Sequence, residues 1–257
     1  MTIKMNTVVF PPVFNYPKLE DFDLFREMAN APVHEGLVGA YFLGSRNVDA
    51  TYNFANAELP LIQIGSPDTS QRGYARLGRR TGYFDTQIKS AAEMTIVAIS
   101  RVPVAGAVAL VVSNYAKETA AKVTGDTLMN RWNASQKPES GFYAQSSETA
   151  VTSISRELAA VAGDYQVTGS IITKDFVIGG WSFSTDGTPR FSTNNMTGRA
   201  TTQRTLLLGC AYSDTEFLGT SDVAAVLIYN RDIGGAQMTN TMNWLRNVIG
   251  PRAGIWE

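Results

Sequence analysis

The chain has 257 residues, of which 18% are charged, against about 25% in an ordinary soluble domain. Lys and Arg number 22 and Asp and Glu number 23, so the net charge of −1 provides no field that would attract nucleic acid or an anionic membrane. One histidine, His34, and one cysteine, Cys210, exclude an internal disulfide and a Cys/His zinc site, and we expect no cofactor.

The composition favours a mainly β protein. The low charge is combined with 18 serines, 25 threonines and 22 glycines, which is typical of a polar but uncharged exterior. The longest apolar run, residues 104–112, is too short for a membrane helix of about 20 residues, and the N-terminus lacks the apolar stretch of a signal peptide. We therefore expect a soluble protein, made in a host cytoplasm without a signal peptide and without membrane insertion.

Residues 1–33 differ from the rest and are predicted to form an N-terminal arm. Residues 8–14 are apolar and interrupted by two prolines, so they must be extended, whereas residues 17–28 predict a helix with proline and acidic residues at its start. Its apolar residues recur every three positions and must pack on something, either the chain's own domain or a neighbouring subunit. In the second case the arm mediates assembly, and the candidate assembly residues are Phe10, Phe14, Leu19, Phe22 and Phe25.

Residues 34–257 predict one β domain. The first strand is expected at 36–43, and two short strands, 74–77 and 83–88, flank a glycine-bounded turn. Two apolar segments, 94–100 and 107–114, predict a buried hairpin in the middle of a sheet.

The second half of the domain continues this pattern. Further strands are expected at 141–144, 165–173, 176–184, 205–211 and 223–230, with helices at 154–162 and 236–248. Many short strands separated by turn residues predict an antiparallel two-sheet β-sandwich with short helices, since each sheet needs cover for its apolar face.

Three segments after Tyr165 carry a family resemblance. Phe176 to Gly187 contains a strand followed by an Asp-Gly turn, and Leu206 to Tyr212 reads Leu-Leu-Leu-Gly-Cys-Ala-Tyr. Gly219 to Ile233 has the form Gly-x-x-x-Val-Ala-x-Val-x-Ile-Tyr-Asn-Arg-x-Ile and precedes the last predicted helix. These segments resemble the laminin-G-like domains of the concanavalin A-like lectin/glucanase superfamily, which implies a jelly-roll sandwich.

The resemblance has further implications. Such domains often carry an acidic residue where this chain has Ala225, and no segment resembles a calcium loop, so no metal is expected. The sandwich and its arm also resemble parts of tailed-phage virion proteins, namely capsid decoration and tail-fibre proteins. That resemblance implies location in a virion.

The residues needed for catalysis are missing, which predicts a protein that is not an enzyme. Glucanases of this fold carry two glutamates on one strand, about 5 Å apart, and this sequence has no such pair. The nearest acidic clusters are Glu20-Asp21-Asp23 and Asp214-Glu216, which we interpret as solvated. His34 is the one available base, and no Gly-x-Ser-x-Gly turn accompanies it.

Aromatic residues beside polar ones are the best candidates for ligand binding. An aromatic ring next to an amide or carboxylate can stack on a sugar while the polar group binds hydroxyls. The candidate carbohydrate-binding residues are Trp132, Asn133, Tyr143, Tyr212 and Asp214. In the alternative interpretation, Tyr143 and Trp181 belong to the core and only Trp132 is exposed.

The leading functional hypothesis is a non-enzymatic virion structural protein, acting as a capsid decoration, fibre or attachment component. It would assemble through its arm with other virion subunits, as a homo-oligomer such as a trimer. The alternative hypothesis is a carbohydrate-binding module that recognises a cell-surface glycan.

Overall fold

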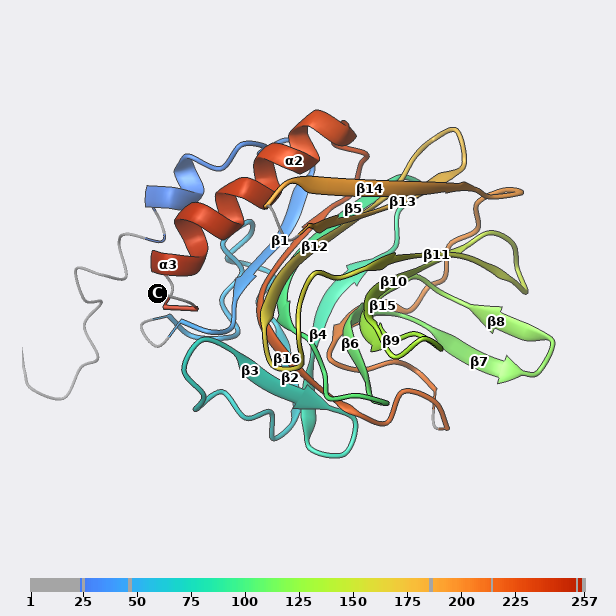
Figure 1. The fold of residues 1–257 in the computed structure, drawn as a ribbon, viewed down its shortest axis with the longest axis horizontal. Helices are drawn as coiled ribbons and strands as arrows, with labels where there is room; N and C mark the ends of the chain where they lie inside the picture. Colours follow the sequence, from blue (N-terminus) through green and yellow to red (C-terminus); the bar gives the residue numbers. More distant parts are fainter. Residues whose placement is uncertain are drawn as a thin grey trace, which may run out of the picture.

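The chain is mainly β in the computed structural model, which describes residues 24, 26–45, 48–184, 187–213, 215–252 and 254–255 (Figure 1). The strands are β1 Leu37–Phe42, β2 Ile62–Gly65, β3 Ala75–Gly78, β4 Gly82–Lys89, β5 Met94–Arg101, β6 Val108–Ser113, β7 Ala116–Thr119, β8 Lys122–Thr124, β9 Thr127–Trp132, β10 Pro138–Gln145, β11 Val151–Glu157, β12 Tyr165–Ile172, β13 Val177–Phe183, β14 Pro189–Asn195, β15 Thr205–Leu208 and β16 Thr220–Tyr229. Helix α2 spans Gly234–Trp244 and continues through a π-helical turn, Leu245–Ile249, into the short α3, Gly250–Arg252.

One large antiparallel sheet of 14 strands dominates the fold. Its order is β11-β10-β9-β6-β15-β4-β3-β16-β5-β12-β13-β14, with β1 added on β16 and β2 on β4. The sheet curls until β11 lies against β13 and β14, which makes it nearly barrel-like. The β7–β8 hairpin is separate and projects from the side away from α2 (Figure 1).

The main core lies inside this curl. Strands β5 and β16 are buried on both faces, and their alternate residues point to opposite sides. Val226 and Ile228 of β16 join Leu128 and Phe142 from the far side of the curl in one cluster. Apolar side chains on both faces of a strand require two covers, so a second layer must lie outside β5 and β16.

Helix α2 supplies that second cover. Met238 and Met242 pack with Leu227 and other residues from the outer faces of β16, β5 and β12. Gly169 of β12 permits this close contact, because a Cβ there would lie 2.6 Å from the Met238 sulfur. The predicted helix at 236–248 is thus confirmed. Among the described residues, no helix is long and apolar enough to cross a membrane.

The predicted strands are confirmed, but the predicted hairpin is wrong. Strand β5 pairs with β12 and β16, whereas β6 pairs with β9 and β15 on the opposite side of the core. The intervening segment crosses between the two sides, and the Val102 amide there bonds to the Asp164 carbonyl at 2.9 Å. Each apolar strand finds its two neighbours elsewhere in the chain.

The predicted helix at residues 154–162 is also wrong. Residues Val151–Glu157 form strand β11, which pairs along its whole length with β10. Its exposure alternates along the strand, so Ile154 and Arg156 face the curl while Ser155 and Glu157 face solvent.

The described end of the N-terminal arm packs on its own domain. Residues 24 and 26–29 are helical, and Leu24 and Met28 are buried in the cluster that contains α2. The candidate assembly residues Phe10, Phe14, Leu19, Phe22 and Phe25 lie outside the described residues.

Candidate functional site

Two of the predicted carbohydrate-binding residues lie close to Tyr115. The ring of Tyr143, on β10, is 6.1 Å from the Tyr115 ring, and its hydroxyl accepts a hydrogen bond from Arg131 at 3.2 Å. The Tyr212 amide donates to the Tyr115 carbonyl at 2.8 Å, and the Tyr212 side chain is 38% exposed. Asp214 lies outside the described residues.

Trp132 and Asn133 lie at the other end of the same hairpin. Tyr143 pairs with Thr127, five residues before Trp132, so the two aromatic rings are separated by about 17 Å along the strand. The Trp132 indole donates to the Pro103 carbonyl at 2.8 Å, and the Asn133 side chain accepts from the amides of the following turn. Both residues have local structural partners, so the predicted residues do not form one site.

The loop before β16 is fastened to the sheet by Glu216. Its carboxylate accepts hydrogen bonds from the Tyr115 hydroxyl at 2.7 Å and from Lys117 at 2.5 Å. Lys117 and then Tyr115 hold the pKa of Glu216 below its usual value, and burial together with Glu216 raises the pKa of Tyr115. Glu216 therefore acts as a structural fastener.

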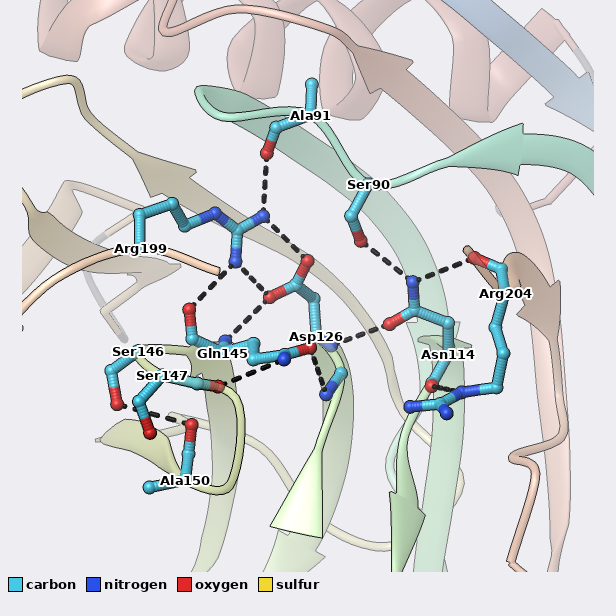
Figure 2. Close-up of polar contacts among 11 residues, drawn as sticks. Ser90, Ala91, Asn114, Asp126, Gln145, Ser146, Ser147, Ala150, Arg199 and Arg204 are labelled. Carbon is cyan, nitrogen blue, oxygen red and sulfur yellow. Dashed lines mark hydrogen bonds and ion pairs between the residues drawn. The ribbon is translucent and has the colours of Figure 1, made fainter. Parts of the chain in front are cut away.

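A buried polar network occupies one end of the curl (Figure 2). The Asp126 carboxylate receives two hydrogen bonds from Arg199, at 2.6 and 2.8 Å, and one from the Gln145 amide at 2.8 Å. The Arg199 and Asp126 side chains are 4% and 2% exposed. Asn114 joins the network through the Asp126 amide, and Arg204 through the Asn114 carbonyl. The network fastens the segment between β14 and β15 to the sheet.

An open feature of the fold lies where the sheet fails to close. Strands β11 and β14 end the strand order, and side chains bridge them in place of a backbone ladder. Arg156 donates to the Ser192 hydroxyl at 2.9 Å, and Asn194 donates to the Ser153 carbonyl at 3.1 Å. We call this line the seam.

The seam widens at one end into a cavity of about 490 Å³, here named the seam cavity. Its lining includes Arg156, Glu157, Ser182, Phe183, Ser184 and Arg190. A second hollow of about 360 Å³, lined by Asp164, Tyr165, Gln166 and Arg246, adjoins it and shares Ala159, Phe183 and Ser184. Both volumes fall in the range of ligand-binding pockets, about 300–1,000 Å³.

The strand register brings two arginines to one face of the seam cavity. Ser182 pairs directly with Arg190 across the β13–β14 ladder, so their side chains share a face. Gly180 has the same orientation, and a Cβ there would lie 3.7 Å from the Arg156 side chain. Arg156 from β11 and Arg190 from β14 therefore flank Ser182.

The charged groups around the cavity differ in whether they have a partner within the chain. Glu157 contacts Lys137 at 3.3 Å, and the Asp164 carboxylate accepts from the Val161 amide at 3.0 Å. The Arg156 Nε is buried without a hydrogen-bond partner. One guanidinium nitrogen at this site thus has no acceptor among the described residues.

Sequence reasoning missed this site. Arg156 fell in a segment interpreted as a helix, and the strand that carries Arg190 was not predicted. Alternation of Thr152, Ile154 and Arg156 with serines and glutamate could have indicated a strand.

Among the described residues, the lining of the seam cavity offers guanidinium donors and hydroxyls but no pairing of nucleophile and base. His34 is exposed and lines a different hollow, with Met28, Leu37 and Phe54. Cys210 is buried, and burial raises the pKa of its thiol. Among the residues that the structure describes, no group of three His, Cys, Asp or Glu side chains could hold a metal ion.

No family model matches the sequence, and no curated protein sequence matches it. The fold, however, is similar to several solved structures. The binding domain of botulinum neurotoxin serotype G aligns with 82% of this chain and 51% of its own length, at 8% identity and a TM-score of 0.56. The serotype D binding domain aligns with 84% of this chain and 53% of its own length, at 5% identity and a TM-score of 0.55.

A sialidase has a similar fold. A mutant of Trypanosoma rangeli sialidase displaying trans-sialidase activity aligns with 85% of this chain and 34% of its own, at 11% identity and a TM-score of 0.52. The tailspike protein 2 of an Escherichia coli O157:H7 bacteriophage aligns at a TM-score of 0.46, which is too low to support an argument. This chain spans about half the length of the neurotoxin binding domains. At these identities the similarity concerns the fold alone, which is that of lectin-like β-sandwich proteins.

Proposed function

We propose that the protein is a carbohydrate-binding module that attaches to a cell-surface glycan through the seam cavity. The observation that carries the proposal is that Arg156 and Arg190 line the seam cavity, while Tyr165 lines the adjoining hollow and Phe183 borders both. Sugars present hydroxyl groups around apolar ring faces, so a site for them needs directed donors beside aromatic carbon. The neighbouring toxin domains are named as binding domains, which supports an attachment role.

We also infer that the fold is a two-sheet jelly roll of the laminin-G-like, concanavalin A-like kind. The order of β16 followed by α2 supports this, because it corresponds to the closing strand and helix of the sequence resemblance. The curl of the sheet supports it as well, because β9 to β11 face β12 and β13 across the core, as two layers would.

The proposal assigns no catalytic activity. Within the described ranges, the carboxylates that line the hollows belong to Glu157 and Asp164, and each already contacts a cation or an amide. A glycoside hydrolase needs one carboxyl group as an acid and a second as nucleophile or base on either side of the scissile bond.

A glycan array probed with the full chain tests this function. We expect the chain to bind a subset of glycans and the Ala159→Trp variant to lose them, because Ala159 is exposed and borders both hollows. The matched control is Ala121→Trp, on the β7–β8 turn, which should keep all binding. Absence of any bound glycan, or full binding by Ala159→Trp, would overturn the proposal.

We further propose that the module belongs to a virus particle, as a decoration, fibre or attachment component that assembles through residues 1–33 as a homo-oligomer. The sequence resemblance to tailed-phage virion proteins supports this location. A test removes residues 1–23 only, because Leu24 and Met28 belong to the core. We expect the shortened chain to lose particle incorporation and to fall to a lower mass in light scattering. Unchanged incorporation and unchanged mass would contradict the proposal.

A further inference from the structure

The seam cavity carries an excess of cationic donors. We infer that the glycan taken by this cavity is acidic and that Arg156 and Arg190 bind its carboxylate from opposite sides. This inference rests on the proposed function and names the chemical class of its ligand.

Arg156 provides the first part of the argument. One of its terminal nitrogens donates to Ser192 at 2.9 Å, which fixes the guanidinium at the seam. Its Nε is buried and has no partner. Arg156 also lines the seam cavity, where a carboxylate would accept a charge-assisted hydrogen bond from its guanidinium.

Arg190 provides the second part. It lies on β14 directly opposite Ser182, on the face that Arg156 covers. The side chain is exposed, and within the described part of the chain it has no ion pair. It can therefore turn toward a ligand without breaking an existing contact.

The surrounding charges agree with an anionic ligand. Arg246 lines the adjoining hollow, with its guanidinium 4.7 Å from the Phe183 ring centroid. The carboxylates that face the two hollows are Glu157, which contacts Lys137, and Asp164, which accepts from the Val161 amide. Arg156 and Arg190 thus share the seam cavity with Glu157, whose carboxylate already contacts Lys137.

A sugar acid fits these groups better than a nucleic acid. The chain has a net charge of −1, so it lacks the broad positive field that a polyanionic backbone requires. Two guanidinium groups match the planar, paired oxygens of a carboxylate. The ring of Tyr165, in the adjoining hollow, lies nearby for the neutral part of a sugar.

Calorimetric titration of the full chain with matched sugars tests the inference. The probes are an oligogalacturonate and its carboxyl-reduced form, together with sialyllactose and lactose. We expect an acidic member to bind at least about tenfold more tightly than its neutral partner, as charge-assisted hydrogen bonds provide. Arg156→Gln and Arg190→Gln should each remove most of this preference, because each should weaken binding of the acidic member more than binding of its neutral partner.

Lys174→Gln is the matched control. It removes the same charge from a side chain that is 73% exposed on the β12–β13 turn, at the opposite end of the hairpin from Phe183. This variant should keep the full preference, and Arg190→Gln serves as the variant that leaves the core intact. Equal affinity for acidic and neutral partners would overturn the inference while leaving a glycan-binding module in place. Failure to bind any glycan, in the array as well as in the titrations, would overturn both.

Discussion

The Asp126–Arg199 pair is predicted to contribute more to stability than any surface ion pair of the chain. It fastens the segment between β14 and β15 to the start of β9, and both side chains are almost completely buried (Figure 2). We consider Arg199→Met, which keeps the aliphatic stem of the side chain and removes the guanidinium. The substitution leaves a buried carboxylate without its counter-ion.

The loss of stability expected for Arg199→Met follows from the hydrogen bonds that the substitution removes. Arg199 donates to both Asp126 oxygens, to the Ala91 carbonyl at 2.7 Å and to the Gln145 carbonyl at 3.3 Å. Removing one partner of a buried pair costs about 3–5 kcal/mol, because the remaining charge stays desolvated. A domain with about 5–15 kcal/mol of total stability would lose a large fraction of it.

Urea unfolding followed by circular dichroism measures this cost, and a double-mutant cycle with Asp126→Asn assigns it to the pair. The double variant should cost less than the sum of the two single variants, by about 1–3 kcal/mol, since the second substitution no longer leaves a lone charge. The exposed pair Lys174–Asp175 is the control, and Lys174→Met should cost no more than about 1 kcal/mol. Additive costs, or a loss below about 1 kcal/mol for Arg199→Met, would refute the reasoning.

Three further predictions concern positions near the sites described above. Gly125→Ala should destabilise the fold by about 1–3 kcal/mol, because Gly125 has φ +99° and a Cβ there would lie 2.4 Å from the Asn114 carbonyl oxygen. Denaturant unfolding that shows no measurable loss of stability would contradict this. Trp132→Ala should lower the melting temperature but leave glycan affinity unchanged, because Trp132 lies outside the seam cavity; a loss of affinity would instead place the ligand at the β9–β10 turn. Lys117 lowers the pKa of Glu216, so the stabilisation by Glu216 is present above the ordinary pKa of 4.5 and is lost as pH falls through the lowered value. The free energy of unfolding should therefore fall less steeply below pH 4.5 for Glu216→Gln than for the wild type. Identical pH profiles of the two proteins would contradict the stabilising role of Glu216.

The strands were predictable where the sequence itself carries the signal. β16 is apolar on both faces, so its burial and central place followed from its residues. Pairing was not predictable for β5 and β6, because a strand apolar on both faces can accept many neighbours. The choice depends on contacts with strands far away in the sequence, namely β12 and β16 for one and β9 and β15 for the other.

β11 shows why a local pattern can mislead. Ile154 and Leu158 are four residues apart and are followed by two alanines, which favours a helix. Pairing with β10 outweighs that preference, since every residue of β11 gains a partner in the ladder. Because of this error, the sequence prediction placed Arg156 on a helix, whereas the structure places it in the wall of a cavity.

The binding site was therefore less predictable than the fold. Tyr143 and Tyr212 both lie near Tyr115, as aromatic candidates beside polar groups. Trp132 and Asn133 have structural partners instead, and no sequence pattern distinguishes an indole that binds a sugar from one that binds a carbonyl. The seam cavity depends on how far the sheet curls, which is a property of the whole chain.

The incomplete closure of the sheet connects stability with binding. Free strand edges attract other chains, and proteins protect them with charged or bulky groups. Here the two edges face each other, and Arg156 and Asn194 bridge them through Ser192 and the Ser153 carbonyl. A complete ladder would protect the edges equally well but would remove the cavity. Bridging by side chains keeps the edges covered and leaves a guanidinium at the cavity wall. A carboxylate bound there would also tie β11 to β14, and it would stabilise the native state by an amount that rises with the logarithm of ligand concentration once that concentration exceeds Kd.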